Sequence, residues 1–317
     1  MESVCCNLCG SDRHRLLYQQ PDLKYYPEEM FNVVECLTCG LGFVNPRPSE
    51  KEIQKYYPIH FFDWFEEDPA LQEKRYKNEA EYLRIVNPGG RKLLDVGCAN
   101  GAFPLFMAKR GWRAEGLEIS PQTSEPEHVA IHRIPLPELP GDNQYGAISM
   151  WAVLEHVHDP MAYIAAASRL LAPGGFLFVQ VPNFGSLQSR RLYREDIPRH
   201  LYFFTKHNIG EYLTRNGLKL VSSTFSDDIY SMSADGWLLY LKTVYWDRQP
   251  YTIGSSKKGR PAFFLERHLK RSMFSSITYL LHHPVDALDT VLTPPLEFLQ
   301  KVLRCYGQVT YVAVKTP

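Results

Sequence analysis

The chain has 317 residues, of which 44% are hydrophobic, enough for one large or two modest domains with a buried core, so a disordered chain and a mini-protein are both excluded. Its 35 basic and 35 acidic residues cancel, and the global positive field typical of nucleic-acid-binding proteins is absent. No apolar run reaches the roughly 18 residues that cross a bilayer, and no basic segment followed by an apolar one opens the sequence, so we expect a cytoplasmic protein.

Two pairs of closely spaced cysteines stand near the start of the sequence. Cys6 and Cys9 form one C-x2-C pair, Cys36 and Cys39 form the other, and a glycine follows each pair. This spacing lets two thiolates reach one ion, and two such pairs complete a tetrahedral four-sulfur site, so we predict a structural zinc ion. Cys5 could replace Cys6, although the two-residue spacing favours Cys6. The alternative of a redox C-x-x-C pair does not explain two matching pairs.

Residues 49–90 connect this zinc ribbon to the rest of the chain. Helices are expected at 50–57 and 69–86, and Asn87-Pro88-Gly89-Gly90 then breaks the chain, as turn residues do. The segment is rich in aromatic residues, which suits a lid over a pocket or simple packing. Packing is the more common use of such residues.

From residue 91, short apolar strands alternate with helices, which indicates a parallel sheet wound with crossover helices. We predict an α/β fold with a doubly wound, Rossmann-like, seven-stranded sheet. The expected strands are 92–96, 113–119, 128–133, 147–151, 176–181, 218–225 and 309–314, and the expected helices between them include 102–110, 160–171 and 206–216.

The first of these strands leads into a turn that contains two glycines. Asp95, Gly97 and Gly101 lie in a D-x-G-x-x-x-G segment, whose glycines allow a tight turn and a close approach of a ligand to the backbone. Glu118 closes the next strand, where a carboxylate in nucleotide-binding units accepts hydrogen bonds from ribose hydroxyls. A glycine turn alone is also compatible with a dehydrogenase.

The amino-acid sequences of these segments resemble those of the class I S-adenosylmethionine-dependent methyltransferases. The D-x-G-x-x-x-G segment is similar to their motif I, and Gly116-Leu117-Glu118-Ile119-Ser120 is similar to the acidic loop that follows. The stretch 145–157, which ends in L-E-H-V, resembles their fourth strand and the start of the next helix. Segments 171–175 and 198–205 resemble later turns of the same family. A four-cysteine ribbon precedes one branch, which includes sugar C-methyltransferases.

The resemblance implies an S-adenosylmethionine site around the glycine turn. The residues that it implies as cofactor contacts are Asp95, Gly97, Ala99, Gly101, Glu118, Ile119, Met150 and Trp151. Glu118 would hold the ribose hydroxyls and Ile119 would pack on adenine. Two positions depart from the family, because Ala99 replaces a common second glycine and Gly146 stands where an aspartate is usual.

Methyl transfer requires an aligned acceptor, exclusion of water and, for some acceptors, removal of a proton. Histidine is the natural proton acceptor near neutral pH. The resemblance puts His156 and His200 on the substrate side of the fold, with Glu155 next to His156. We predict His156 as the base and His200 as its alternative or as a residue that shapes the pocket. Glu155 would orient a histidine or interact with a helix dipole, and a structural role for these residues is the remaining alternative.

Residues 226–305 interrupt the pattern before the last strand. They contain the basic run Lys257-Lys258-Gly259-Arg260 and helical patterns at 273–281 and 295–303. We predict a helical insertion that caps the substrate pocket. Because apolar faces lie beside positive charge, contact with an anionic membrane or a lipid-linked substrate is an alternative.

The sequence thus predicts an S-adenosylmethionine-dependent methyltransferase that acts on oxygen or carbon of a small-molecule, sugar or lipid-linked acceptor. Its expected parts are a zinc ribbon (1–48), a helical linker or lid (49–90), the methyltransferase domain (91–225 with 306–317) and the insertion (226–305). An RNA base methyltransferase is an alternative, against which the neutral charge counts, so nucleic acid is not an expected partner. A non-catalytic binding or scaffold protein with this fold is the alternative from a different class.

Overall fold

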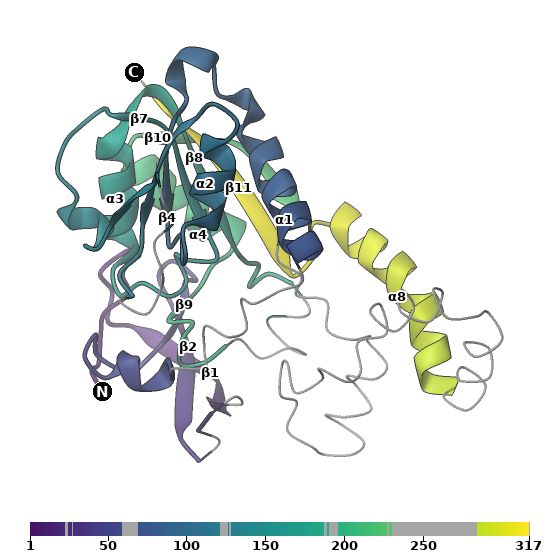
Figure 1. Ribbon diagram of the computed structural model, residues 1–317. Helices are drawn as coiled ribbons and strands as arrows, with labels where there is room; N and C mark the ends of the chain where they lie inside the picture. Colours follow the sequence, from purple (N-terminus) through teal and green to yellow (C-terminus); the bar gives the residue numbers. More distant parts are fainter. Residues whose placement is uncertain are drawn as a thin grey trace.

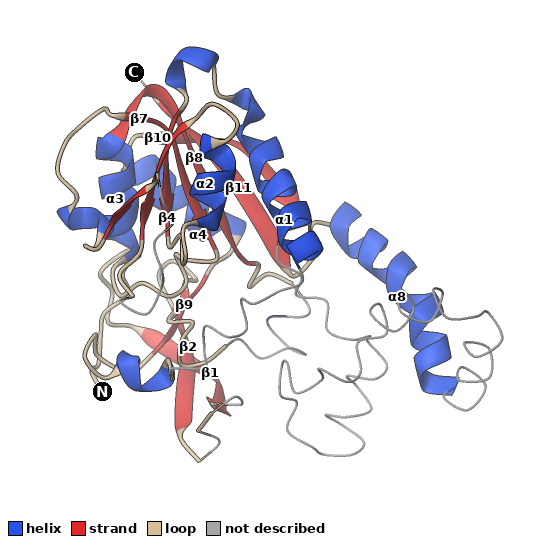
Figure 2. Ribbon diagram, viewed as in Figure 1, coloured by secondary structure: helices blue, strands red, loops and turns tan. Residues whose placement is uncertain are grey.

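The computed structural model describes residues 1–22, 25–26, 28–58, 69–120, 126, 128–186, 189, 196–226, 228–229 and 284–316. Within these residues the strands form two sheets, one of seven strands and one of four (Figures 1 and 2). The basic run 257–260 and the predicted helix 273–281 lie outside the described residues.

The seven-stranded sheet confirms the predicted α/β, Rossmann-like fold. Its strand order is β10-β11-β8-β7-β4-β5-β6. The strands are β4 (Lys92–Val96), β5 (Arg113–Leu117), β6 (Ala130–His132), β7 (Tyr145–Trp151), β8 (Leu171–Pro182), β10 (Leu218–Phe225) and β11 (Gln308–Lys315). Neighbouring strands are parallel from β6 to β8, whereas β11 runs antiparallel to both β8 and β10. The chain adds strands from β4 toward β6 first and then from β7 toward the opposite side of the sheet, so the winding order reverses between the parallel strands β4 and β7. Folds of this kind bind ligands at such a point.

Helices cover both faces of this sheet (Figure 2). They are α1 (Pro69–Tyr82), α2 (Ala102–Ala108), α3 (Pro160–Leu170) and α4 (Lys206–Arg215). Both α3 and α4 begin at a side-chain cap, since Asp159 accepts a hydrogen bond from the Ala162 N–H and Thr205 forms a capping box with Asn208. The local sequence therefore sets where these helices start.

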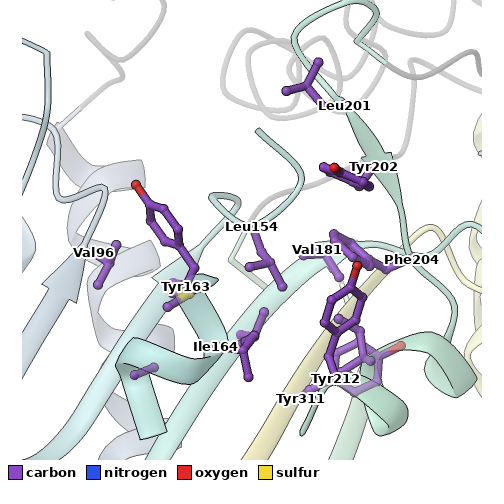
Figure 3. Close-up of a cluster of buried hydrophobic side chains, with 14 of the residues drawn as sticks. Val96, Leu154, Tyr163, Ile164, Val181, Leu201, Tyr202, Phe204, Tyr212 and Tyr311 are labelled. Carbon is purple, nitrogen blue, oxygen red and sulfur yellow. The ribbon is translucent and has the colours of Figure 1, made fainter. Parts of the chain in front are cut away.

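Two clusters of buried side chains fill the space between the helices and the sheet. The larger one lies under α3 and α4, and Figure 3 shows part of it, including Tyr163 and Ile164 of α3 and Tyr212 of α4. The smaller cluster lies under α1 and α2 and contains Tyr76 and Phe103. Alternating residues of β4 and β7 enter opposite clusters, because successive strand side chains point to opposite faces. The polar residues at the ends of these strands are thereby held in a rigid frame.

The four-stranded sheet combines the N-terminal part of the chain with a distant segment. It consists of β1 (His14–Pro21), β2 (Met30–Cys36), β3 (Gly42–Val44) and β9 (Tyr202–Phe203), in the order β1-β2-β3-β9. β3 and β9 are antiparallel, and Phe43 pairs with Tyr202. The division at residue 48 stays a prediction, but this sheet crosses it.

Two helix predictions need correction. The stretch 50–57 contains only the 3-10 turn η1 (Ile53–Tyr56), since Pro58 disfavours the helical conformation of Tyr57 before it, whose φ and ψ are −115° and 71°. The helix expected at 295–303 is part of the longer α8 (Pro284–Val302), which contains Pro294 and Pro295. Pro284 stands at its first position, where the missing N–H of proline costs nothing. Figure 1 shows α8 extending away from the large sheet.

The structure gives a physical reason for Gly146, the position in β7 where the resembling family usually has aspartate. A Cβ atom there would lie 1.7 Å from the carbonyl oxygen of Gly90. The 3-10 turn η4 (Pro88–Gly90) thus lies directly against β7, so any side chain would have to displace the backbone. Glycine at this position is therefore explained by the close packing of η4 against the start of β7.

Candidate functional site

The glycine turn after β4 lies beside the turn after β7. Gly97 and Gly101 have positive φ angles of 71° and 73°. A Cβ atom on Gly97 would meet Cγ2 of Val153 at 2.5 Å, so the close approach of the two turns requires glycine as well. Because β4 and β7 are adjacent and parallel, both turns open at the same edge of the sheet, where the chain reverses its winding direction.

Glu118 is tied to this glycine turn by backbone hydrogen bonds. Its Oε2 accepts a bond from the Ala99 N–H at 3.1 Å, and its Oε1 accepts one from the Ser120 N–H at 2.8 Å. Burial raises the pKa of Glu118, while these two N–H groups oppose the shift. A carboxylate has about four lone-pair sites, so the two bonds leave acceptor capacity for ligand hydroxyls. Ala99 itself adopts a positive φ of 50°, as the glycine common at this position would.

Asp95, the acidic residue of the D-x-G segment, lies inside the sheet. It is 3% exposed, and its Oδ1 accepts a hydrogen bond from the Ser149 hydroxyl at 2.6 Å. Burial raises its pKa to about 7, with the Ser149 bond opposing the shift. The side-chain hydrogen bond of Asp95 thus links β4 to Ser149 of β7, the neighbouring strand across the point where the winding order reverses.

The remaining predicted cofactor contacts differ in accessibility. Ile119 is 57% exposed, whereas Met150 and Trp151 are 0% and 6% exposed. The Trp151 ring packs near Tyr82 and Phe103, with centroid distances of 6.0 and 6.3 Å. Only Ile119 among these predicted contacts presents open surface, and the roles of all three toward a cofactor stay predictions.

The structure brings Glu155, His156 and His200 together, and their place on the substrate side stays a prediction. One donor atom of each lies within 4.8 Å of the other two. The two imidazole rings meet edge to face with their centroids 4.7 Å apart. Glu155 is 1% exposed and His200 is 9% exposed, while His156 is half-buried. Such a group of donors can share a proton or hold a small cation.

The hydrogen bonds of His156 fix which of its ring nitrogens is basic. Its Nδ1 lies 3.0 Å from the Arg199 carbonyl oxygen and 3.0 Å from the Tyr57 hydroxyl. A carbonyl oxygen can only accept, so the Arg199 contact is a hydrogen bond when Nδ1 carries the proton, and the Tyr57 hydroxyl oxygen is then a second acceptor of the same N–H. Nε2 then holds the lone pair that can take a proton from another group. Tyr57 lies in the aromatic-rich segment 49–90, for which the sequence predicted a lid or simple packing and no contact with a histidine.

Electrostatics keeps His156 uncharged at neutral pH. Burial and, to a smaller extent, the neighbouring His200 lower its pKa to about 3, against the opposing effect of Asp196. Burial also raises the pKa of Tyr57, so its phenol stays protonated. The site therefore presents a neutral imidazole and a neutral phenol to any bound molecule.

The four predicted zinc ligands converge at the end of the N-terminal sheet where β2 finishes with Cys36. Sγ atoms lie 3.4 Å apart in Cys6 and Cys39 and 3.5 Å apart in Cys9 and Cys36, and all four lie within 4.8 Å of one another. Zinc–sulfur bonds of 2.3 Å in a tetrahedron would put sulfurs about 3.8 Å apart. The donor set and its spacing therefore fit one zinc ion.

Comparison with known proteins identifies the kind of domain that carries the first of these sites. Residues 71–223 match a family model described as "Methyltransferase domain". The chain is 30% identical over 141 residues to the "Ubiquinone biosynthesis O-methyltransferase" of Acinetobacter baumannii, an alignment that covers 36% of this chain and 60% of the relative. For the enzyme of the same name from Methylococcus capsulatus, identity is 33% over 148 residues, covering 42% and 61%. The chain thus spans about 60% of the length of these curated relatives.

A solved structure agrees with the fold. A S-adenosylmethionine-dependent methyltransferase from Archaeoglobus fulgidus has a TM-score of 0.50 at 16% identity, covering 82% of this chain and all of that one. At this identity the likeness concerns the fold alone. The comparisons thus show a likeness of residues 71–223 to a methyltransferase domain and, for the chain as a whole, a Rossmann-like methyltransferase fold.

The low pKa of His156 predicts a specific dependence of stability on pH. Below pH 6.5 the unfolded chain takes up a proton on this residue and the folded chain does not, so the free energy of unfolding falls as pH decreases toward 3. In a His156→Gln variant, denaturant unfolding between pH 7 and pH 4 should show a pH slope smaller by up to one bound proton. The exposed His207→Gln is the control. An unchanged slope would show that folded His156 protonates normally.

Proposed function

We propose that this chain is a class I methyltransferase, which transfers a methyl group from S-adenosylmethionine to an oxygen or carbon atom of a small-molecule acceptor. The observation that carries the proposal is the juxtaposition of two turns. The Gly97–Gly101 turn, which is hydrogen-bonded to Glu118, lies next to the turn that bears Glu155 and His156. Both turns follow the parallel strands β4 and β7, between which the winding order of the sheet reverses. One turn offers a nucleoside-type site and the other offers proton-accepting groups.

The cofactor proposal assigns the glycine turn to the ribose and methionine parts of S-adenosylmethionine. The bound sulfonium would supply an electrophilic methyl group. Glu118, with spare lone pairs, would hold the ribose hydroxyls, and the exposed Ile119 would pack on adenine. Asp95, Gly97, Ala99, Gly101, Met150 and Trp151 would form the rest of the pocket.

Glu118 provides the test of this site. Glu118→Ala should weaken binding of S-adenosylhomocysteine, the stable product, by about 1.5–3 kcal/mol, because charge-assisted bonds to two hydroxyls are lost. Titration calorimetry measures the effect, and Glu138→Ala, an exposed carboxylate on the loop before β7, is the control. Wild-type protein that does not bind the product at all would instead favour a non-catalytic scaffold.

The choice of acceptor rests on the relatives and on α8. The curated relatives are named as O-methyltransferases of ubiquinone biosynthesis, which supports an oxygen acceptor on a quinol-like ring. Many apolar side chains of α8 and the residue after it are exposed, namely Leu288, Val291, Leu292, Leu296, Phe298, Leu299, Val302 and Leu303. This surface supports a lipid-linked acceptor or contact with a membrane surface, as the sequence suggested for the insertion. A sugar acceptor is the second candidate, supported by the ribbon-bearing branch of the family.

The cellular location is a further part of the proposal. Among the described residues, no helix combines the length and apolarity needed to cross a membrane. We propose that the protein acts in the cytoplasm. With 35 basic and 35 acidic residues, its net charge does not favour a nucleic-acid substrate.

We further propose that His156 removes the acceptor proton through Nε2, with His200 as the alternative base and Glu155 as the group that orients the pair. Transfer of radioactive methyl groups to 3,4-dihydroxybenzoate, a soluble quinol, a nucleotide sugar and transfer RNA identifies the acceptor class. His156→Ala should then lower the rate by roughly 100-fold or more, because general base catalysis is worth that much. Product affinity should hardly change, and His207→Ala should leave the rate intact. A larger loss in His200→Ala transfers the role to His200, and full activity in both variants excludes both of these histidines as the base.

We also propose that Cys6, Cys9, Cys36 and Cys39 hold one structural zinc ion. Elemental analysis should find one zinc per chain in the wild type and none in a Cys36→Ser/Cys39→Ser double variant, since two thiolates cannot retain a structural site. Cys5→Ser is the matched control, because Cys5 adjoins a ligand and is exposed. Zinc lost in Cys5→Ser would move the ligand assignment from Cys6 to Cys5.

A further inference from the structure

We propose that Arg199 is a positioning residue, which holds the His156–His200 pair against the N-terminal sheet through a buried ion pair with Asp22. The role of this pair in methyl transfer rests on the proposed function. The positioning itself is a property of the folded chain, so it has a test that needs no acceptor.

The guanidinium group of Arg199 is fully buried and fully bonded. Its Nη1 and Nη2 donate to the two Asp22 carboxylate oxygens at 3.0 and 2.8 Å. Nε and Nη2 donate to Oδ1 of Asp196 at 2.9 and 2.6 Å, and Nη1 also donates to the Tyr56 carbonyl at 3.0 Å. All five N–H donors of the side chain are thereby used. Arg199 and Asp22 both have side chains that are 0% exposed.

The backbone of Arg199 carries the other half of the connection. Its carbonyl oxygen accepts the Nδ1–H of His156 and thereby selects Nε2 as the basic nitrogen. The next residue is His200, whose N–H donates to the Asp196 carbonyl at 2.7 Å. The Leu201 N–H donates to the Glu155 carbonyl at 2.8 Å. A shift of Arg199 would therefore move both histidines and the turn that bears Glu155.

Two partners of Arg199, Asp22 and Tyr56, come from the N-terminal part of the chain. Asp22 directly follows β1, and its N–H donates to the Glu29 carbonyl just before β2, so it belongs to the hairpin of the N-terminal sheet. Tyr56 ends η1 and precedes Tyr57, whose hydroxyl lies 3.0 Å from Nδ1 of His156. One guanidinium thus joins the hairpin, the linker and the histidine segment.

Arginine is specifically suited to this place. Its planar group presents donors in a fork that matches carboxylates two at a time, whereas lysine has one nitrogen with three donors. A lysine at 199 keeps the buried charge, but its single nitrogen has three donors for the five bonds that Asp22, Asp196 and the Tyr56 carbonyl accept. Removal of one carboxylate leaves buried charge less well compensated, which is more disruptive than loss of an exposed pair.

The experiment compares Arg199→Lys and Asp22→Asn with the control Glu35→Gln. Glu35 pairs with Arg15 on the same N-terminal sheet, and Arg15 is exposed. Nitrogen-15 spectra of the imidazoles, assigned with His156→Gln, report the tautomer of His156. The wild type and the control should show one tautomer with the proton on Nδ1. Both test variants should show a mixture, while zinc content and affinity for S-adenosylhomocysteine stay within about threefold of wild type, since neither residue touches those sites.

The kinetic readout follows once the acceptor screen has found a substrate. Turnover of the test variants should fall at least tenfold with little change in KM, because misaligned groups act on the transition state. A single Nδ1–H tautomer and full turnover in either folded test variant overturn the proposal. If Arg199→Lys does not fold, Asp22→Asn decides, because asparagine keeps the shape and one acceptor oxygen. Wild-type protein that transfers no methyl group to any probe refutes the proposed function, whereas the spectra still decide the positioning role.

Discussion

The antiparallel pairing of β3 with β9 is the contact on which the arrangement of the site depends. It inserts two residues that follow the histidine segment into the sheet that carries the cysteines, with Phe43 opposite Tyr202. The N-terminal part is therefore a wall of the candidate active site. Because β9 is part of both regions, Arg199 and His200 have a fixed position relative to the turn after β7.

Buried charge reinforces this pairing at two points. Arg47, 8% exposed, donates to the Glu2 carboxylate, the His158 carbonyl and the Tyr202 hydroxyl at 2.7 to 2.9 Å. Arg199, just before β9 in the chain, similarly bonds to Asp22 and to the Tyr56 carbonyl. Each guanidinium is satisfied only when the N-terminal sheet occupies one orientation, since a buried unpaired charge is costly. Apolar contact alone would tolerate small rotations, whereas these hydrogen bonds hold the histidine segment in one orientation.

Local signals in the sequence predicted much of this molecule, and distant pairings were beyond them. Seven strands follow from apolar runs bounded by turn residues, and the cysteine spacing and the L-E-H-V segment are continuous motifs. β9 has two residues and no periodicity, so only its partner β3 makes it a strand. Likewise Asp22 lies 177 positions from Arg199, and nothing near either residue in the sequence predicts their contact. Tyr57 belongs to the same class, as a linker residue that the fold carries to His156.

The pairing of β3 with β9 also bears on synthesis of the chain at the ribosome. The hairpin of β1 and β2 and all four clustered cysteines precede residue 40, yet the free edge of β3 finds its partner only at residue 203. At usual elongation rates of 5–20 residues per second, that edge stays open for roughly 8–30 s. An open strand edge can pair with another nascent chain. Early metal capture by the cysteines would hold the hairpin in shape during this interval, before the histidine segment that precedes β9 has been synthesised.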